Sequence, residues 1–581
     1  MAKRREEKPK MGNEEIARIL DEIGDLLDIL GESTFRVQAY HKAAMNIRSM
    51  PRSISEVYEA GELQTIPGVG AHLAERIGIL LETGRLPYLE ELKKKVPVRL
   101  TELISIPGLG AKKAKKLYDE LNVTTIDELK KAIAQHKVRE LPGMGAKTEE
   151  NILRGIRQLE QMHGRILLYE ALPISEEVIR GLREQGFVER ADTAGSLRRM
   201  KETIGDIDLL CSSREPDRVM EYFTTMPHVA YVVARGETKS SIVVTTGLQM
   251  DLRVVAPEQY GAALQYFTGS KAHNIHLRDI AKKRGLKINE YGVFKVDTDE
   301  RVAGATEEGV YEYLGMDTPP PVLREDRGEI EAAMEHRLPK LIQLSDIKGD
   351  LQMHTNATDG VNRLEEMVEA AVALGYEYIC ISDHAERLKV AGGLTEKELR
   401  EQFEKIDRLN ETMKGFRILK GVELNIDNDG NVDYSDSFLA EMDVTIASIH
   451  GGFNQPKQQL TRRMLRAMEN PHVDIIAHPT GRILGKREPY DIDLPTIFKA
   501  AAETGTILEL NSFPDRLDLR DDYLMDAKFN YGCKFAINTD AHNANHLRYM
   551  RYGIATAQRG WLEKEDVVNA HPLEKMLRML K

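Results

Sequence analysis

Three aspartates in two β-branched stretches could hold a pair of metal ions. Asp206 and Asp208 lie two residues apart in GDIDLL, and Asp251 lies in the later run QMDLRVV. Alternate side chains of a β-strand share a face, so these carboxylates are expected to converge on one point. They would repel one another unless divalent cations lay between them, and two Mg²⁺ ions about 3.5–4 Å apart are the expected occupants. One ion would activate an attacking hydroxyl, and the other would bind a triphosphate and its leaving group.

Possible phosphate-binding groups precede the first two aspartates. Gly195 and Ser196 can offer backbone N–H and hydroxyl donors, and Arg199 adds a positive charge one helical turn later. An isolated Asp-x-Asp is a weak signal, because solvated aspartate pairs are frequent in loops. The combination with Gly-Ser upstream and Asp251 downstream favours nucleotidyl transfer over that alternative.

A second group of possible metal ligands follows successive predicted strands in the C-terminal part of the chain. In a βα barrel the C-terminal ends of the strands meet at one rim, so such residues would form a single cluster. Imidazole and carboxylate ligands without thiolate suit Mn²⁺, Zn²⁺ or iron in a hydrolytic role. One histidine at a strand end is usually structural, but here six strand ends carry such residues. The expected ligands are His354, Asp359, His384, Glu423, His450, His478, Asp540 and His542.

A glycine turn occurs three times in the helical region 13–160, as IPGVG (66–70), IPGLG (106–110) and LPGMG (141–145). The proline stops one helix, and the glycines permit a tight turn and close approach of the backbone. Free N–H groups at the start of the next helix can then bind a phosphate. Three copies predict helix-hairpin-helix binding of DNA without sequence specificity, and the alternative is a plain helical array. The expected DNA-binding glycines are Gly68, Gly70, Gly108 and Gly110.

Length and composition place these motifs in a chain of several globular domains. The 581 residues are expected to form at least three hydrophobic cores. A run of about 20 apolar residues is absent, and no apolar segment follows the charged start, so we expect a cytoplasmic protein without membrane association. The three cysteines form no CxxC pair, which leaves oxygen and imidazole as metal ligands. The net charge of −12 argues mildly against nucleic acid, but a basic run between 93 and 116 could follow a phosphate backbone or be a solvated helical face.

The pattern of apolar residues divides the chain into regions of different architecture. Residues 13–160 have helical spacing, and short β-branched runs between about 188 and 256 predict a sheet. The prolines at 319–321 indicate a linker. After about 348, six strand patterns alternate with helical ones, which is typical of a βα architecture with a parallel sheet.

With these motifs in place, the first 320 residues resemble DNA polymerase beta and its bacterial family X relatives. GSLRR with GDIDLL is similar to the palm motif of that family, MDLRVV to the segment with its third catalytic aspartate, and YFTGS to its nucleotide-pocket motif. INEYGVF and GETK are also family-like. The resemblance implies nucleotide contacts by Arg165, Tyr266, Phe267, Gly269 and Asn274, and DNA contacts by Lys239, Arg253 and Arg278. It also implies a monovalent cation on the backbone carbonyls of Ile104, Ile106 and Leu109.

The C-terminal histidine and carboxylate cluster resembles the polymerase and histidinol phosphatase (PHP) domain. That family is a distorted barrel with a trinuclear metal site, which implies up to three Mn²⁺ or Zn²⁺ ions here. The first motif of the family usually has a histidine two residues before His354, where this chain has Gln352. An amide oxygen is a poorer ligand than imidazole, so we expect one metal to bind weakly or to be a different element.

The two resemblances together imply a multidomain fold. It consists of all-α helix-hairpin-helix domains, an α+β nucleotidyltransferase palm and thumb, and a C-terminal distorted β/α barrel. The expected parts are an N-terminal DNA-binding domain (1–88), a fingers-like helical domain (89–155), a palm (156–260), a thumb-like nucleotide-selection domain (261–318), a linker (319–347) and a PHP phosphoesterase domain (348–581).

The implied function is repair synthesis by a monomer on gapped or primer-template DNA. The palm would add deoxynucleotides from their triphosphates to a primer 3′ end, and the PHP domain would act as a 3′→5′ exonuclease. Two alternatives stay open. The chain could be another nucleotidyltransferase that acts on RNA ends or small molecules, or a DNA-binding scaffold whose PHP domain only packs against the polymerase.

Animal relatives of the family also carry a lyase activity, in which a lysine amine forms a Schiff base with a 5′-deoxyribose phosphate. Aligning IPGVGAHLAERIGILLETGRL on the first hairpin of the family puts Arg76 at the position of that lysine and His72 at a supporting lysine. A guanidinium stays protonated at any accessible pH. We therefore predict recognition of the 5′-phosphate without efficient lyase chemistry, with Lys42 as the substitute nucleophile if that chemistry occurs.

Overall fold

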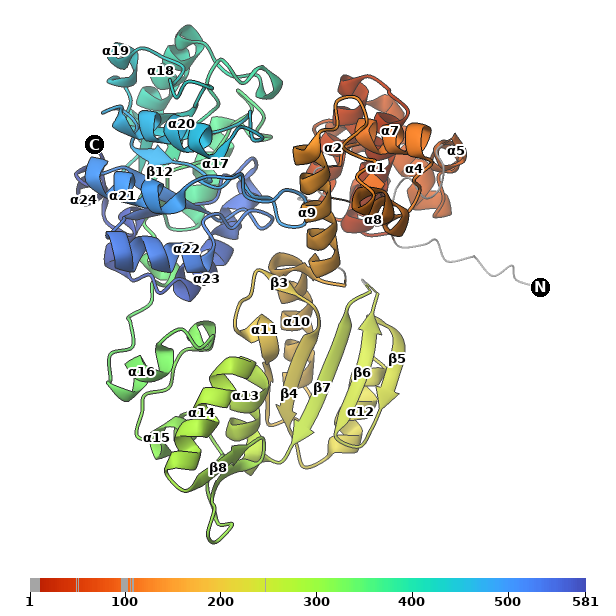
Figure 1. Cartoon of the computed structure of the whole chain (residues 1–581), viewed down its shortest axis with the longest axis vertical. Coiled ribbons are helices and arrows are strands. Elements are labelled where there is room, and N and C mark those ends of the chain that lie inside the picture. Colours follow the sequence, from red (N-terminus) through yellow and green to blue (C-terminus); the bar gives the residue numbers. More distant parts are fainter. Residues whose placement is uncertain are drawn as a thin grey trace.

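The computed structural model describes residues 11–48, 50, 52–95, 103–104, 106, 109–162, 164–245 and 247–581. Figure 1 shows a group of short helices in the N-terminal part, an open sheet with helices in the middle of the chain, and a larger α/β unit at the C-terminal end. This order confirms the predicted sequence of all-α, α+β and βα architectures. Among the described helices, none has the length and apolar character needed to cross a membrane.

The N-terminal region is built from short amphipathic helices around one core. Ile16, Leu20 and Ile23 of α1 follow the three- and four-residue spacing of one helix face, and all three are fully buried. One cluster of buried apolar residues extends from Met11 to Ile156, so the two predicted helical domains share a core. The helices are α1 (Asn13–Ile29), α2 (Thr34–Arg48), α3 (Ile54–Glu59), α4 (Ala71–Thr83), α5 (Pro87–Lys95), α7 (Ala111–Leu121), α8 (Ile126–Ala134) and α9 (Ala146–Met162).

Each glycine hairpin lies directly before one of these helices. Gly70 is the N-cap of α4, Gly110 is the N-cap of α7, and the third hairpin ends where α9 begins. Gly68 (φ +81°) and Gly143 (φ +76°) adopt left-handed backbone conformations that residues with a side chain rarely adopt. The predicted helix-hairpin-helix arrangement is therefore confirmed in the described residues.

The central region is a five-stranded sheet with the order β2-β4-β7-β6-β5. Strands β4 and β7 are parallel neighbours, and the other pairs are antiparallel. Helices α10 (Leu168–Arg183) and α12 (Pro216–Thr224) contribute buried residues to the core of this unit. The strands are β2 (Arg190–Thr193), β4 (Ile207–Ser212), β5 (Val229–Arg235), β6 (Lys239–Val244) and β7 (Gln249–Val255), and the pair β1 (Ile166–Leu167) and β3 (Thr203–Ile204) lies apart from this sheet.

Three helices and a small antiparallel sheet follow the palm. The segment expected to be a linker is folded against them. It contains α16 (Glu329–Met334), and its fully buried Arg324 pairs with Glu307 at 2.5 Å. Buried His273 Nδ1 lies 2.6 Å from Glu329 Oε1. The elements are α13 (Tyr260–Thr268), α14 (Lys271–Lys283), β8 (Leu286–Asn289), β9 (Gly292–Lys295), β10 (Arg301–Ala303) and α15 (Glu307–Tyr313).

The C-terminal region is a seven-stranded parallel sheet in sequential order from β11 to β17. An isolated parallel bridge between Met353 and Ala541 joins the segments that follow its two edge strands, so the sheet is nearly closed into a barrel. The six predicted strand patterns correspond to β12 to β17, and the structure adds β11, which has only two residues. The strands are β11 (Gly349–Asp350), β12 (Tyr378–Ile381), β13 (Arg417–Asn425), β14 (Val444–Ser448), β15 (Ile475–Ile476), β16 (Ile507–Asn511) and β17 (Phe535–Asn538).

Helices cover the outside of the barrel (Figure 1). Phe403 of α18 and Phe498 of α21 are buried in the same apolar cluster as residues of the strands. The main helices are α17 (Leu364–Ala373), α18 (Glu396–Thr412), α20 (Lys457–Glu469), α21 (Leu494–Thr504), α22 (Asp521–Asp526), α23 (Met550–Arg559) and α24 (Leu573–Leu577).

The palm and the barrel pack directly against each other. Leu517 and Tyr552 of the barrel region belong to the buried cluster of the palm. An ion pair of 2.7 Å joins Arg482 to Glu202. These apolar and charged contacts fix one orientation of the two units in this structure.

Candidate active sites

The palm sheet brings two of the three predicted aspartates into register. Asp208 on β4 and Asp251 on β7 are direct partners in the parallel ladder, so their side chains share a face. Asp206 is exposed in the bend before β4. Burial, followed by the charges of Asp206 and Asp251, raises the pKa of Asp208 to about 6. The three carboxylates are therefore close enough to repel one another, which is the arrangement that a divalent cation would relieve.

Lys239 at the start of β6 contacts this group of carboxylates. Its Nζ lies 2.7 Å from Asp251 Oδ2, and Gln249 Nε2 donates a hydrogen bond of 2.9 Å to Asp251 Oδ1. Burial alone would raise the pKa of Asp251, but the hydrogen bond from Lys239 is the largest of several contacts that lower it overall. In this structure the lysine that was predicted to contact DNA thus neutralises one of the predicted catalytic carboxylates.

The predicted phosphate-binding turn lies against the same carboxylates. Gly195 begins the short helix α11 (Gly195–Arg198) with φ +56°. A Cβ at this position would lie 2.2 Å from Asp208 Oδ2, so only glycine allows the turn to approach the carboxylate this closely. Ser196 follows at partial exposure. The turn and the aspartates therefore form one continuous site.

The two arginines predicted to bind the triphosphate are held by other groups in this structure. Arg199 Nε donates to Glu325 Oε1 at 3.0 Å, and its Nη1 donates to the carbonyl of Thr268 at 2.5 Å. Arg165 donates to the hydroxyl of Thr203 at 3.0 Å. Its guanidinium also lies beside Gly205, where a Cβ would be 3.0 Å from Nη1. Arg165 is therefore placed next to the Gly-Asp turn that carries Asp206.

The YFTGS segment ends helix α13 beside the palm sheet. The rings of Tyr266 and Phe267 are edge to face with centroids 5.1 Å apart, and the guanidinium of Arg253 lies 4.6 Å from the Phe267 centroid. Asn274 donates a hydrogen bond of 2.8 Å to the carbonyl of Tyr266. Gly269 is buried and has φ +68°. The structure thus brings these predicted nucleotide-contacting residues and Arg253 together.

The predicted DNA-contacting glycines of the hairpins are exposed where the structure describes them. Gly68, Gly70 and Gly110 lie on the surface, and Gly108 lies outside the described residues. Arg278 is exposed on α14, one turn after Asn274. These groups are accessible to a DNA strand.

Glu423 at the C-terminal end of β13 lies at the centre of the predicted ligands of the barrel. Its Oε2 is 3.3 Å from His384 Nδ1 and 3.4 Å from His354 Nε2. Its Oε1 is 3.1 Å from His450 Nε2 and 3.2 Å from His478 Nε2. One buried carboxylate therefore contacts four imidazoles, and each of its oxygens faces two of them.

Two further carboxylates complete the cluster. Asp359 Oδ2 lies 3.5 Å from Nε2 of both His384 and His542, and Asp540 Oδ1 lies 3.1 Å from His354 Nε2. Ligand atoms within 4.8 Å of one another form three overlapping sets. The sets are His354, Asp359, His384 and His542; His384, Glu423 and His450; and His354, Glu423 and Asp540.

The chemistry of these donors fits a centre with several divalent metals. Burial alone would raise the pKa of Glu423, but the charges of His384 and His450 lower it well below its usual range. Burial alone would lower the pKa of His542, but Asp359 raises it to about 10. The cluster therefore holds protons between its carboxylates and imidazoles, and metal binding would have to release them.

Gln352 occupies the position where the family usually has a histidine ligand. Its side chain is fully buried, and neither amide atom has a hydrogen-bond partner among the described residues. An unpaired buried amide costs free energy, so this side chain is suited to a ligand that the protein itself does not provide. The amide oxygen fits a weak metal contact.

Family models match four parts of this arrangement. They describe a helix-hairpin-helix domain (residues 11–86), a SAM-like helix-hairpin-helix tandem (100–158), the DNA polymerase beta thumb (263–325) and a PHP domain (350–513). The DNA polymerase/3′-5′ exonuclease PolX of Bacillus subtilis (strain 168) is 41% identical over 573 residues, which cover 98% of this chain and 100% of that protein. This chain belongs to the bacterial family X DNA polymerases.

Other relatives of this family X polymerase match a shorter part of the chain. A probable phosphatase of Thermoanaerobacter sp. (strain X514) is 32% identical over 230 residues, which are 38% of this chain and 89% of that protein. A probable phosphatase of Syntrophotalea carbinolica is 29% identical over 229 residues, or 38% of this chain and 90% of that protein. Divalent metal dependence follows from the family and from the ligand sets in the barrel.

Sequence reasoning missed a polar network that joins the polymerase site to the PHP domain. Glu325 Oε1 accepts hydrogen bonds from Arg199 and from Arg559 of α23, both at 3.0 Å. Arg559 also donates to the carbonyl of Arg199 at 2.7 Å and to Asp521 Oδ2 at 2.6 Å. No local pattern could reveal it, because Glu325 and Arg559 are 234 residues apart. In this structure Arg199, the arginine predicted to bind the triphosphate, is thus ion-paired with Glu325. A triphosphate would have to replace Glu325 in order to bind Arg199.

We expect Glu325→Gln to lower the KM for an incoming deoxynucleoside triphosphate about two- to tenfold, because the triphosphate no longer competes with a carboxylate for Arg199. Steady-state kinetics of gap filling would measure this change. Glu312→Gln, at an exposed position of the same domain, is the control and should leave the KM unchanged. A KM that rises in Glu325→Gln would mean that Glu325 holds Arg199 in its productive position.

Arg76, which the resemblance predicts to stand at the position of the lyase nucleophile, stacks on a tyrosine ring. The guanidinium of Arg76 lies 3.6 Å from the centroid of the Tyr88 ring. Lys42 is exposed and lies against the first hairpin, where a Cβ at Gly68 would be 3.3 Å from Lys42 Cγ. Arg76 can bind a 5′-phosphate but cannot act as an amine nucleophile.

We therefore expect little covalent product when borohydride is added to the enzyme on gapped DNA with a 5′-deoxyribose phosphate. Arg76→Ala should weaken binding of that 5′-phosphate without changing the amount trapped. Strong trapping that survives Arg76→Ala and disappears in Lys42→Ala would instead assign the amine to Lys42.

Proposed function

We propose that this chain fills short gaps during DNA repair as a DNA-directed DNA polymerase and trims 3′ ends with its PHP domain as a 3′→5′ exonuclease. The observation that carries the proposal is the presence of two separate acidic clusters in one chain. One is the Asp208–Asp251 pair on the palm sheet, and the other is the cluster around Glu423 in the barrel. The name of the Bacillus subtilis relative, which matches over its whole length, combines the same two activities.

In the palm, Asp206, Asp208 and Asp251 would hold two Mg²⁺ ions. Bound there, Mg²⁺ supplies positive charge that lowers the pKa of a primer 3′ hydroxyl and neutralises the triphosphate. The backbone N–H groups of Gly195 and Ser196 would bind the phosphates. Arg199 would add its charge after it leaves Glu325, and Arg165 would act beside it.

The resemblance implies the nucleotide and DNA roles of the remaining residues. Tyr266, Phe267 and Gly269 would line the sugar pocket, and Asn274 would contact the incoming base pair. Contacts to DNA strands would come from Gly68, Gly70, Gly110, Lys239, Arg253 and Arg278, and from Gly108, which lies outside the described residues. A monovalent cation at the second hairpin, on the carbonyls of Ile104, Ile106 and Leu109, would support such a contact.

In the PHP domain, the eight histidine and carboxylate ligands would hold up to three Mn²⁺ or Zn²⁺ ions. Bound metal supplies Lewis acidity and a nucleophile at neutral pH for phosphodiester hydrolysis. Gln352 would be the weakest contact of the set, because an amide oxygen replaces an imidazole. The buried imidazoles and carboxylates keep one another oriented, and they would release their shared protons when metal binds.

The proposed division of the chain is the one inferred from the sequence, with boundaries near 88, 155, 260, 318 and 347. The protein would act as a monomer in the cytoplasm on gapped or primer-template DNA. The first two hairpins would contact the strands around a gap while the palm extends the primer.

A primer-extension and degradation assay on short-gap DNA tests the proposal. With Mg²⁺ and deoxynucleoside triphosphates the primer should lengthen to fill the gap. With Mn²⁺ and no nucleotides it should shorten from its 3′ end. A protein that binds gapped DNA but leaves the primer unchanged in both mixtures, and that contains no bound metal, would be a scaffold instead.

A further inference from the structure

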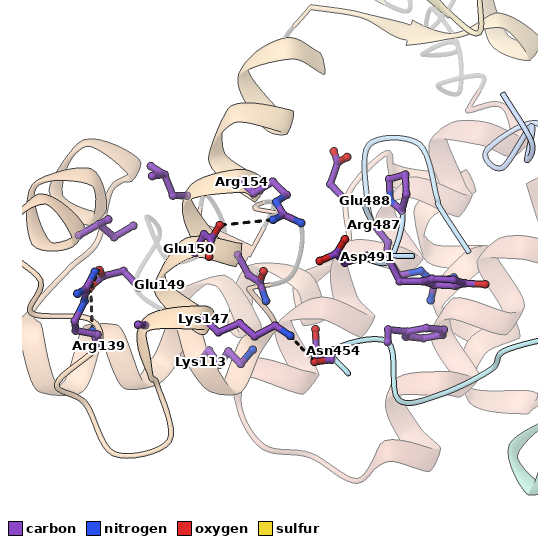
Figure 2. A pocket seen from close by; sticks show the side chains of 18 of the residues that line it. Lys113, Arg139, Lys147, Glu149, Glu150, Arg154, Asn454, Arg487, Glu488 and Asp491 are labelled. Atoms are coloured by element: carbon purple, nitrogen blue, oxygen red, sulfur yellow. Dashed lines mark hydrogen bonds and ion pairs between the residues drawn. The ribbon is translucent and has the colours of Figure 1, made fainter. Parts of the chain in front are cut away.

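A cavity of about 940 Å³ lies between helix α9 and two loops of the PHP domain (Figure 2). Figure 2 shows Lys147 and Arg154 on the helical side and Asn454, Arg487 and Glu488 on the opposite side. The helix follows the third hairpin, LPGMG, to which the proposed gap-filling function gives no role. Helix α9, which begins directly after the hairpin, and the PHP domain thus border a common space.

The helical wall is held in place by charged contacts. Lys147 Nζ donates a hydrogen bond of 2.7 Å to the carbonyl of Asn454, which ties α9 to the opposite loop. Buried Glu149 pairs with Arg139 at 2.6 Å, so this carboxylate is neutralised within the wall. Arg154 is exposed and lies one helical turn beyond Glu150. Arg154 pairs with Glu150 at 3.8 Å, so a ligand would have to draw Lys147 and Arg154 away from their present partners.

The PHP wall carries stacked planar groups. The rings of Phe453 and Tyr490 are nearly parallel, at 8° with centroids 6.0 Å apart, and the guanidinium of Arg487 lies 4.4 Å from the Phe453 centroid. Phe453 is half-buried, whereas Tyr490 is buried and donates its hydroxyl hydrogen to the carbonyl of Pro479 at 2.8 Å. Aromatic rings and guanidinium planes are the surfaces on which proteins stack unpaired nucleobases.

This wall is continuous with the metal-ligand cluster. Phe453 lies three residues after His450, and Pro479 directly follows His478, so the two loops that line the cavity also carry two of the predicted ligands. A Cβ at Gly481 would lie 2.4 Å from the Tyr490 ring, which shows how closely the loop after His478 packs against it. Two loops thus connect the lining of the cavity with His450 and His478.

The charges around the cavity favour a short single strand over a duplex. Lys113, Lys147, Arg154 and Arg487 can each meet a phosphate, but Glu150, Glu488 and Asp491 also line the space. A lining with both basic and acidic side chains can bind the few phosphates of a short single strand. It is less suited to a double helix, which carries a much higher density of negative charge. The cavity volume lies within the range typical of small-ligand pockets. A few nucleotides would fill a space of this size.

We propose that this cavity is a binding subsite for single-stranded DNA that guides the 3′ end of a strand from the third hairpin to the PHP metal cluster. The proposal rests on the proposed exonuclease function of the PHP domain. Bases would stack on the planar groups around Phe453, and Lys147 and Arg487 would hold the backbone. The third hairpin would then serve the nuclease, whereas the first two serve the polymerase.

Short oligonucleotides with 2-aminopurine at one of the last four positions of the 3′ end test this subsite. The full-length protein is used in EDTA, so that binding is measured without hydrolysis. The fluorescence of at least one oligonucleotide should fall on binding, because the base stacks. Phe453→Ala should weaken this quenched complex about tenfold, and Lys147→Ala at least threefold. Phe529→Ala and Lys499→Ala, at exposed positions of the PHP domain away from the cavity, are the matched controls.

Wild-type quenching and affinity in both Phe453→Ala and Lys147→Ala would overturn the subsite. Lys147 is exposed, so its variant carries the test if Phe453→Ala fails to fold. Hydrolysis with Mn²⁺ separates the two proposals. If the variants lose quenching but the wild type releases no nucleotide, the subsite is supported and the exonuclease is not. If the wild type and both variants degrade 3′ ends with the same KM, the exonuclease is supported and the subsite is overturned.

Discussion

Asp206→Ala and Asp251→Ala are each expected to reduce DNA synthesis by about a thousandfold or more, because each removes a carboxylate that would hold the polymerase metals. Burial, followed by the charges of Asp206 and Asp251, raises the pKa of Asp208, so the three carboxylates interact within one site. DNA binding and 3′-end degradation should stay close to wild type, since the hairpins and the barrel ligands are separate. Primer extension and degradation on the same gapped substrate measure both activities.

Asp217→Ala is the matched control for the palm variants. Asp217 is an exposed aspartate in the first turn of α12 of the same domain. Its replacement should leave synthesis unchanged, which would show that the loss does not follow from any change of surface charge. Near-normal extension by either Asp206→Ala or Asp251→Ala would remove the assignment of catalysis to the palm.

The sequence predicted the palm site because its residues lie in short, strongly patterned runs. The spacing of Asp206 and Asp208 suggested one strand, yet β4 begins only at Ile207 and Asp206 lies in the preceding bend. Asp206 still lies close enough for its charge to raise the pKa of Asp208, after the larger effect of burial, and Gly195 and Asp251 both lie beside Asp208. The pairing of β4 with β7 joins residues 43 positions apart, and a strand pattern alone does not give such a register.

Contacts between charged side chains that lie far apart in the sequence could not be predicted either, because a strand or helix pattern does not give the tertiary pairing. Lys239 was expected to face DNA, but it pairs with Asp251 because β6 and β7 are neighbours in the sheet. Arg199 was expected to be free for phosphate, but Glu325 and Arg559 come together around it from distant parts of the chain. Strand β11 was missed because two residues carry no periodicity. Local sequence patterns thus predicted which residues belong to the sites, whereas tertiary packing determines which residues they contact.

The barrel site was predictable to a greater extent, because parallel strands deliver their C-terminal ends to one rim. His384, His450 and Asp540 follow β12, β14 and β17, Glu423 lies at the C-terminal end of β13, and the structure brings them around a common centre. The sequence could not reveal that Glu423, which like His354 and His384 belongs to two of the three ligand sets of the described residues, is contacted by four imidazoles. That central position makes Glu423 the most informative residue to change.

Glu423→Gln is expected to abolish metal-dependent degradation of DNA, by about a thousandfold or more, and to leave gap filling intact. The amide keeps the volume of the buried side chain but removes the negative charge that faces His354, His384, His450 and His478. Without that charge, the two metal sets that include Glu423 lose their shared anionic ligand, so metal content per protein molecule should also fall. His384→Ala and Asp540→Ala should have the same effect on degradation.

The matched control for these variants is His472→Ala, which changes a histidine of the same domain outside the three ligand sets. It should keep wild-type nuclease activity and metal content. Metal analysis by mass spectrometry and 3′-end degradation with Mn²⁺ would be measured on each protein, together with primer extension with Mg²⁺. If degradation persists in Glu423→Gln and His384→Ala but vanishes in Asp206→Ala, hydrolysis takes place at the palm and the PHP cluster has another role. If synthesis is lost in Glu423→Gln while metal content is normal, the palm depends on the packing of the barrel against it, through contacts such as Arg482 to Glu202.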